Sequence, residues 1–354
     1  MKTLTVALPG RSYDILIERG LLDQAGEHCR AVLPRASRLF VVTDSTVGPL
    51  YLKRTTPSLE AAGFETAICE IPAGEASKCA GELSRLWECM MDFGLTRTDA
   101  VIALGGGVVG DLAGFAAATY LRGVRCVQLP TTLLSAVDSS VGGKTAIDLK
   151  AGKNLAGAFL QPAAVLCDTD CLASLPAAVF ADGAAEAIKT GVLSDESLFT
   201  LFEDGSLTTA PAAVIARCVA YKAGVVERDE REQGERRLLN LGHTVGHAIE
   251  KCSSYAIPHG HAVAAGLAVI ARSAEALGWT EEPIAARIAA CLAKNGLPTG
   301  TEYGAAELAH AASADKKRAG GDITLVIPKK IGVCELKKVP VEQLLPVIAA
   351  GLEG

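Results

Sequence analysis

Several features that mark other classes of protein are scarce or absent in this sequence of 354 residues. Aromatic residues make up only 5% of it. Its longest apolar stretch, Ala262–Ala271, is far shorter than the roughly 20 residues that a membrane helix needs. Residues 1–10 lack an apolar core behind a basic start, so they do not resemble a secretory signal. These absences predict a soluble cytoplasmic protein with no membrane partner.

The charge and the cysteines narrow the class further. Lys and Arg number 34 against 40 Asp and Glu, for a net charge of −6, so a broad basic surface for nucleic acid is not expected. The 11 cysteines include no Cys-x-x-Cys pair. This disfavours a disulfide framework or a thiolate metal site and favours buried, reduced thiols.

The length of the chain predicts two domains, because a single hydrophobic core is rarely this large. Up to about residue 172, short apolar strands alternate with helical stretches, which is typical of a parallel sheet with crossover helices. The expected strands are a first one within 1–10, then 39–43, 66–71, 100–104, 124–129 and 164–167. Residues 173–354 read as a helical domain with a late strand. Its expected elements are helices 182–203, 211–229, 239–252, 262–277 and 282–295, a strand 322–327 and a last helix from 341.

A glycine-rich turn follows the predicted strand 100–104. The run Gly105–Asp111 satisfies G-x-G-x-x-G and leads into a helical stretch, which is the context of a dinucleotide-binding turn. Glycines let the backbone approach a pyrophosphate, and the helix N-terminus attracts its charge. Asp44, at the end of an earlier strand, is a candidate for binding an adenosine ribose, although it precedes the glycines. A tight turn without a ligand is the alternative.

A second glycine segment, Gly142–Thr145, looks like a phosphate-binding P-loop. The first glycine of that motif would fall on Asp138, so the P-loop interpretation fails. Lys144 still lies in a polar stretch that runs from Asp138 to Asn154. Either a substrate-binding loop or a solvated turn fits it.

Four of the six histidines fall within Gly242–His261. His243 and His247 are four residues apart and share one helical face, which suits two metal ligands or one ligand beside a substrate group. Glu186, an acid among alanines, is the candidate third ligand. Hydrogen-bonded core histidines and a surface Glu are the alternative. Cations scattered through the apolar helices predict an anionic small substrate as the partner: Lys189, Lys222, Arg236, Arg237, Lys316 and Lys317.

Four strings together resemble the 3-dehydroquinate synthase family, over nearly the whole length: 103–112 (ALGGGVVGDL), 129–134 (LPTTLL), 137–145 (VDSSVGGKT) and 238–244 (LLNLGHT). The resemblance implies an α/β plus all-α protein. A Rossmann-like NAD-binding domain would comprise residues 1–172, a helical metal- and substrate-binding domain would comprise residues 173–354, and the chain would form a homodimer.

The resemblance also implies the site residues. Zn²⁺ or Co²⁺ would be held by Glu186, His243 and His259. NAD would lie along Asp44, Gly74, Glu75, Lys78, Gly106, Gly107, Val108, Gly110, Asp111, Thr131, Thr132, Lys144, Lys153, Cys171, Leu172 and Ser174. The phosphorylated sugar-acid substrate would meet Arg122, Asp138, Lys144, Asn154, Lys189, Lys222, Arg236, Asn240, His247 and Lys316 or Lys317.

This sequence departs from the family pattern at two positions. His261 stands where the family usually has an acid, which leaves open whether His259 or His261 is the ligand. Thr46 stands where an Asn often contacts the adenosine.

The implied reaction is the conversion of 3-deoxy-D-arabino-heptulosonate 7-phosphate to 3-dehydroquinate and phosphate, through transient oxidation by NAD, phosphate elimination, re-reduction and aldol closure. Three rivals remain at this point: a metal-dependent alcohol or glycerol dehydrogenase, a cyclase that makes another ring, and a dinucleotide-binding regulator without catalysis. Glu186 and the cations count against a dehydrogenase, and Arg236 with Asn240 favours a carboxylate-bearing substrate.

Overall fold

The computed structural model of the protein describes residues 1–313 and 321–353. The chain forms two compact units. The first comprises Met1–Leu175 together with Lys222–Glu227, and the second comprises Pro176–Tyr221 and Arg228–Gly354. None of the helices in the described part of the chain is both long and apolar enough to cross a membrane.

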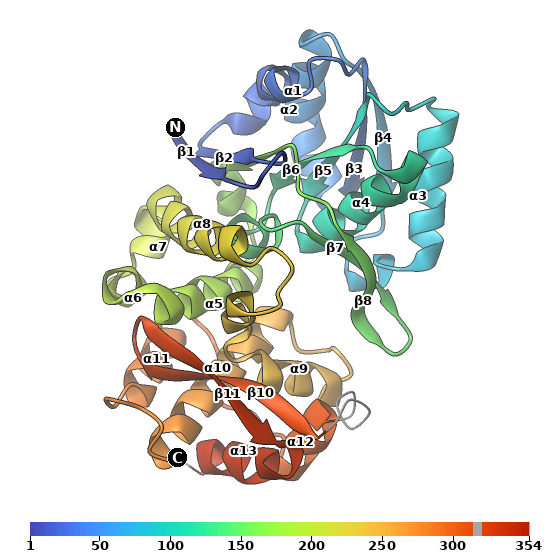
Figure 1. Ribbon diagram of the computed structural model, residues 1–354. Coiled ribbons are helices and arrows are strands. Elements are labelled where there is room, and N and C mark those ends of the chain that lie inside the picture. Colours follow the sequence, from blue (N-terminus) through green and yellow to red (C-terminus); the bar gives the residue numbers. More distant parts are fainter. Residues whose placement is uncertain (314–320, 354) are drawn as a thin grey trace. The chain divides into compact units, whose positions relative to one another are not determined.

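The first unit is built on a 7-stranded sheet in the order β1-β2-β9-β6-β5-β3-β4 (Figure 1). β1 pairs antiparallel with β2, and all other neighbours in this sheet are parallel. The strands are β1 (Lys2–Val6), β2 (Tyr13–Glu18), β3 (Arg38–Asp44), β4 (Glu65–Ile71), β5 (Ala100–Gly105), β6 (Arg125–Pro130) and β9 (Ala164–Asp168). The sequence therefore predicted β3, β4, β5, β6 and β9 to within one or two residues, whereas it did not predict β2.

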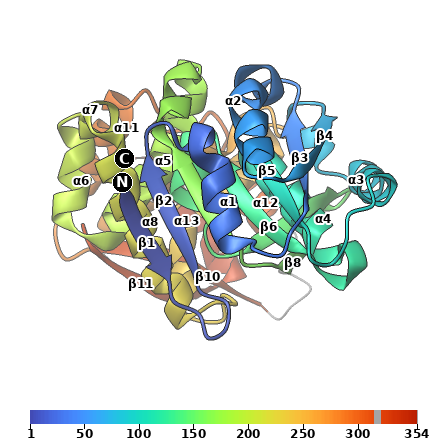
Figure 2. The same ribbon diagram turned by 90° about the horizontal axis from the view of Figure 1, so that it is seen from above.

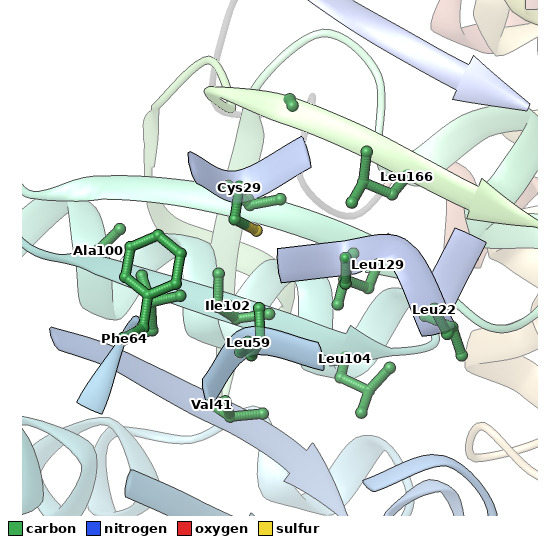
Figure 3. Packing of buried hydrophobic residues seen from close by; sticks show 14 of the residues in the cluster. Leu22, Cys29, Val41, Leu59, Phe64, Ala100, Ile102, Leu104, Leu129 and Leu166 are labelled. Atoms are coloured by element: carbon green, nitrogen blue, oxygen red, sulfur yellow. The ribbon is translucent and has the colours of Figure 1, made fainter. Parts of the chain in front are cut away.

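Helices cover both faces of this sheet, because alternate side chains of its buried strands point to opposite sides. One apolar cluster contains Val41 and Ile102, as Figure 3 shows, and the other contains Phe40 and Val101. α1 and α2 lie together over the first face (Figure 2), and α3 and α4 supply residues to the second cluster. These helices are α1 (Ala25–Val32), α2 (Val47–Ala61), α3 (Ala80–Asp92) and α4 (Gly107–Thr119).

Shorter elements complete the first unit. A hairpin that the sequence did not predict, β7 (Lys144–Leu149) with β8 (Gly152–Phe159), forms its own 2-stranded sheet (Figure 1). The short helical turns are η1 (Leu21–Gln24), η2 (Glu75–Ser77), η3 (Tyr120–Arg122), η4 (Ser135–Ser139) and η5 (Thr169–Ser174).

The second unit is helical, as predicted, with one hairpin of β10 and β11 that packs on α10 through β10 (Figure 1). Its elements are α5 (Ala177–Ser194), α6 (Glu196–Glu203), α7 (Ser206–Thr209), η6 (Glu235–Asn240), α9 (His243–Cys252), α10 (His259–Ala276), α11 (Ala285–Lys294), α12 (Ala305–Ser313), β10 (Asp322–Lys330), β11 (Val333–Pro340), η7 (Val341–Gln343) and α13 (Leu344–Leu352). Helix α8 (Pro211–Arg228) contributes residues to both units.

Several predicted helix boundaries were wrong, including the starts of α5, at Ala177 rather than 182, and of α11, at Ala285 rather than 282. The stretch 182–203 is two helices, because extended Asp195 ends α5 and its carboxylate accepts the Leu198 N–H at the start of α6. Gly242 has a left-handed backbone, so α9 begins at His243 rather than near residue 239. α10 begins at His259, directly after Pro258, rather than at residue 262.

Candidate functional site

Three helices of the second unit bring together the side chains of the predicted metal site. Glu186 lies on α5, His243 begins α9 and His259 begins α10. Glu186 Oε1 lies 3.6 Å from His243 Nε2 and 3.3 Å from His259 Nε2. One ligand atom from each residue falls within 4.8 Å of the other two. The Glu186 side chain is 1% exposed and that of His259 is 31% exposed, so the cluster is buried at the carboxylate and open to solvent at His259.

Glycines explain why these helices approach so closely. A Cβ at Gly266 of α10 would lie 2.3 Å from the carbonyl oxygen of Gly242, and one at Gly246 of α9 would lie 3.0 Å from Val263 Cα. At Gly260 a Cβ would lie 1.9 Å from the carbonyl oxygen of Asp182 on α5. Only glycine permits such backbone contact, so these positions set the spacing of the three ligand-bearing helices.

Hydrogen bonds on the far side of each imidazole set its orientation. His243 Nδ1 lies 3.1 Å from the carbonyl oxygen of Leu241, and His259 Nδ1 lies 3.2 Å from Oε2 of Glu250. A carbonyl and an ionised carboxylate can only accept, so both Nδ1 atoms carry protons. Both Nε2 atoms therefore face Glu186, as a shared metal ion would require.

The protonation of Glu186, His243 and His259 determines whether they can bind a metal cation. Burial would raise the pKa of Glu186, but the Lys189 ammonium and the two imidazoles outweigh it and hold that pKa well below its ordinary value. Burial, together with Lys189, lowers the pKa of His243 to about 3, which keeps its ligand nitrogen free of a proton at neutral pH. Burial also opposes protonation of His259, but its hydrogen bonds to Glu186 and Glu250 raise its pKa to about 10. A metal ion would displace the Nε2 proton of His259.

An ionised carboxylate and two imidazole nitrogens match an open catalytic site for Zn²⁺ or Co²⁺. The residues therefore fit the expected metal. A second group of possible ligand atoms, on His247, Glu250 and His259, shares His259 with the first. His261 belongs to neither group, since its Nδ1 and its backbone N–H both lie against Oδ1 of Asp182, at 3.1 and 3.0 Å.

The predicted anion-binding groups of the second unit are ordered by neighbours. Lys189 Nζ donates to the carbonyl oxygen of Leu239 at 2.7 Å and pairs with Glu186 at 2.5 Å. Arg236, 1% exposed, donates to the carbonyl oxygen of Glu230. Asn240 Nδ2 donates to Glu232 Oε1 at 2.7 Å.

The other predicted substrate-binding residues of this unit are His247 and one of two lysines. His247 is exposed, with its ring centroid 5.2 Å from that of His243. Lys316 and Lys317 lie outside the described residues.

In the first unit, the predicted nucleotide-binding segments follow the carboxyl ends of parallel strands. The glycine turn follows β5, Thr131 and Thr132 follow β6, Asp44 ends β3, and Cys171, Leu172 and Ser174 follow β9. The strand order reverses between β3 and β5, and ligands of such sheets bind outside the carboxyl ends of the strands at this point. A Cβ at Gly106 would lie 3.0 Å from Thr132 Cγ2, so the turn has little room for another residue.

Lys78 joins the other predicted nucleotide residues. Its side chain is 4% exposed, and Nζ lies 3.2 Å from a Glu75 carboxylate oxygen and 2.9 Å from Oδ2 of Asp111. Nζ also donates to Oδ1 of Asn154 at 2.5 Å. Asp148 accepts the backbone N–H of Asn154, which has a left-handed φ of 57°. Asn adopts this backbone conformation more readily than other residues that carry a side chain.

The remaining predicted residues of the first unit lie in three places. Lys222, on α8, donates from Nζ to the carbonyl oxygen of Asp138 at 2.6 Å and to its Oδ1 at 2.5 Å. Arg122 is exposed and has a left-handed φ of 69°. Lys144 begins β7, and Lys153 lies in β8.

The sequence analysis missed three supporting carboxylates: Asp148, Asp182 and Glu250. The spacing held a signal for Glu250, which is three residues after His247 and seven after His243 on the same helix. Asp182 likewise precedes Glu186 by one turn of α5.

The parallel α/β unit followed by a helical unit is the fold of solved sugar phosphate cyclases. A 2-deoxy-scyllo-inosose synthase solved with carbaglucose-6-phosphate, NAD⁺ and Co²⁺ matches with a TM-score of 0.87 and 24% identity, over 99% of this chain and 100% of that one. The 2-epi-5-epi-valiolone synthase of Streptomyces hygroscopicus, solved with NAD⁺ and Zn²⁺, matches with a TM-score of 0.86 and 27% identity, over 98% of each chain.

The sequence comparisons are more specific. Models for the N-terminal and C-terminal parts of 3-dehydroquinate synthase match residues 68–182 and 183–318. The 3-dehydroquinate synthase of Desulforamulus reducens is 46% identical over 347 residues, which is 96% of each chain. The chain belongs to the 3-dehydroquinate synthase family.

Proposed function

We propose that the protein converts 3-deoxy-D-arabino-heptulosonate 7-phosphate to 3-dehydroquinate and phosphate, as a carbon–oxygen lyase of the shikimate pathway that uses NAD and Zn²⁺ or Co²⁺. The observation that carries the proposal is the family membership over nearly the full length, together with a Glu186, His243 and His259 cluster whose ligand atoms face one another.

The bound cofactors would supply transient oxidation of a substrate alcohol and its polarisation, with NAD along the glycine turn and the metal on Glu186, His243 and His259. A ketone at that position would make the proton on the neighbouring carbon acidic, and loss of that proton would allow phosphate to leave. After re-reduction of the ketone, opening of the sugar ring would free the carbonyl group that an intramolecular aldol closure requires.

The protein's own residues orient the substrate and move its protons. Arg122, Lys153 and Asn154 of the first unit are proposed to bind the phosphate, because cationic and amide donors suit its oxygens. Lys189, with its ammonium fixed by Glu186 and Leu239, would add positive charge. Arg236 and Asn240 would bind the substrate carboxylate.

Three further groups are proposed to act on protons or on the substrate hydroxyls. An imidazole nitrogen of His247, exposed beside His243, would carry a proton to or from the substrate. Lys222 holds Asp138 through two contacts, so this pair would offer an ordered acceptor and donor to the hydroxyls. Lys144 and Lys316 or Lys317 belong to the same proposal by family resemblance.

A homodimer and a cytoplasmic location belong to the proposal as well. The homodimer rests on the family resemblance. The location is supported by the cysteines, since all those in the described residues are free thiols, as expected in a reducing compartment.

The decisive experiment supplies the metal-loaded protein with the substrate and a catalytic amount of NAD, and follows phosphate release together with the product by NMR. We expect stoichiometric phosphate and 3-dehydroquinate, no accumulation of NADH, and loss of both products after chelation. A protein that binds NAD but releases no phosphate would contradict the proposal. Turnover of a hexose or heptose phosphate instead would indicate a cyclase that makes another ring, and net NADH from simple polyols would indicate a dehydrogenase.

A further inference from the structure

Glu250 is a buried carboxylate to which the proposed reaction gives no role. It lies on α9, is 2% exposed, and contacts His259 of the next helix. Burying a carboxylate is costly unless it has well-placed partners. We therefore expect Glu250 to have a neighbouring group that its negative charge stabilises.

The contact with His259 constrains that imidazole. Glu250 Oε2 lies 3.2 Å from Nδ1, while Nε2 lies 3.3 Å from Oε1 of Glu186. Because an ionised carboxylate only accepts, the Nδ1 proton points to Glu250. The ring then has one orientation, which aims Nε2 at Glu186. His243 receives the same support from the carbonyl oxygen of Leu241.

The backbone near His259 adds a reason for this support. His259 is the first residue of α10, and the connection from α9 includes Ser254 and Tyr255, with left-handed φ values of 52° and 64°. The Tyr255 N–H donates to the carbonyl oxygen of Glu250 at 2.7 Å. The main-chain carbonyl of Glu250 thus holds the connection between α9 and α10, and its carboxylate holds His259, the residue that follows this connection.

We propose that Glu250 is a positioning residue of the metal site, which holds His259 so that Nε2, and not Nδ1, binds the ion beside Glu186 and His243. This inference rests on the proposed metal dependence. A carboxylate behind a histidine ligand fixes the ring and increases its basicity, and loss of such a partner typically weakens metal binding about 10- to 100-fold.

The alternative is that Glu250 itself binds the ion, with His247 and His259 as the other ligands. One observation favours positioning. Both Nε2 atoms of the first group already face a common carboxylate.

The test measures Co²⁺ affinity by competition with a chelator, and the visible spectrum of bound Co²⁺, in Glu250→Gln, Glu250→Leu and the wild type. Glutamine keeps an acceptor for the Nδ1 proton but loses the charge, so we expect affinity about 3- to 10-fold weaker and a wild-type spectrum. Leucine removes the acceptor, so affinity should fall about 10- to 100-fold. The matched control is Glu275→Gln. Glu275 lies on α10, as His259 does, but it accepts the Ala285 N–H at 2.6 Å, so its loss should leave Co²⁺ affinity unchanged.

Each other outcome overturns the inference. Equal, large losses with a changed spectrum in both Glu250 variants would make Glu250 a ligand. Wild-type affinity in Glu250→Gln would show that the negative charge of Glu250 does not support the metal site, which the inference requires, and this result decides the matter even if Glu250→Leu fails to fold. If the wild type binds no Co²⁺, the proposed metal dependence fails as well, which separates that failure from one confined to Glu250.

Discussion

The nucleotide-binding region of the first unit and the metal-binding region of the second are built in different ways. In the first, the predicted contacts are largely glycines, backbone groups and small side chains at the carboxyl ends of parallel strands. In the second, they are charged or ionisable side chains from three helices. The difference is that sheet topology positions the first region, whereas glycine contacts between helices position the second.

This difference determines which changes each region tolerates. A site built from backbone groups is sensitive to added side-chain volume. A site built from side chains is sensitive to the loss of one ligand and to shifts of the helices that carry it. Four substitutions test this comparison, and they follow in order of decreasing predicted effect.

The substitution His243→Ala should have the largest effect, because it removes a ligand whose Nε2 faces Glu186. We expect bound metal and the rate of phosphate release each to fall by at least about 100-fold, beyond the loss expected for an outer-shell residue. Metal analysis and the phosphate assay measure this. His310→Ala, on α12 and outside both ligand groups, is the control. Full metal content in His243→Ala would contradict the proposed ligand set.

The substitution Gly106→Val should disturb the other region. A Cβ at this position already lies 3.0 Å from Thr132 Cγ2, so the larger side chain must displace the turn. We expect NAD affinity to fall about 10-fold, or about 1.4 kcal/mol, with metal affinity unchanged. Titration calorimetry with each ligand measures both. Gly81→Ala, whose Cβ would meet only Cys79 Sγ at 3.8 Å, should bind NAD normally. Unchanged NAD affinity in Gly106→Val would place the nucleotide elsewhere.

The substitution Gly266→Ala tests whether helix spacing supports the metal site. Its Cβ would lie 2.3 Å from the carbonyl oxygen of Gly242, so α9 and α10 must separate. We expect the free energy of unfolding to fall by about 1–3 kcal/mol, as for an overpacked core, and metal affinity to weaken with it. Denaturant unfolding and chelator competition measure the two effects. Gly300→Ala, with no atom within 4 Å of its Cβ, is the control. Retained stability would show that the contact is dispensable.

The substitution Asp182→Asn should have the smallest effect. It weakens the pairing between Asp182 and His261, which joins α5 to α10. The His261 side chain is 20% exposed. The asparagine oxygen can still accept the His261 N–H, so we expect a loss of stability of no more than about 1 kcal/mol and little change in metal content. Thermal unfolding and metal analysis measure this. A loss of metal as large as that of His243→Ala would make His261 or Asp182 part of the binding site.

The sequence was informative where local patterns decide the structure. Buried parallel strands such as Ala100–Gly105 are continuous apolar runs, and they were located closely. The β7 and β8 hairpin was missed because β8 is mostly exposed or half-buried and rich in small or polar residues, without the alternation of a half-buried strand. The break at Asp195 was missed because an apolar pattern continues on both sides of it, and only the capping contact with Leu198 reveals the end.

The same distinction applies to the site. The clustering of histidines and the lone acid Glu186 predicted a metal site, and family resemblance added His259. Glu250 and Asp182 were not predicted. Their spacing places them on the same helices as His243 and Glu186, but the residues that they contact, His259 and His261, lie on another helix, and spacing does not identify such partners. Resemblance left His259 and His261 as alternatives. The contacts favour His259, because His261 faces Asp182.

The central claim is that Glu186, His243 and His259 hold a catalytic metal ion. The most direct test is anomalous X-ray diffraction from crystals of the protein grown with Zn²⁺, which locates the ion and its ligand atoms. We predict one ion bound by the Glu186 carboxylate and by Nε2 of both histidines. An ion on His247, Glu250 and Nδ1 of His259, or no ion at either group, would contradict the claim.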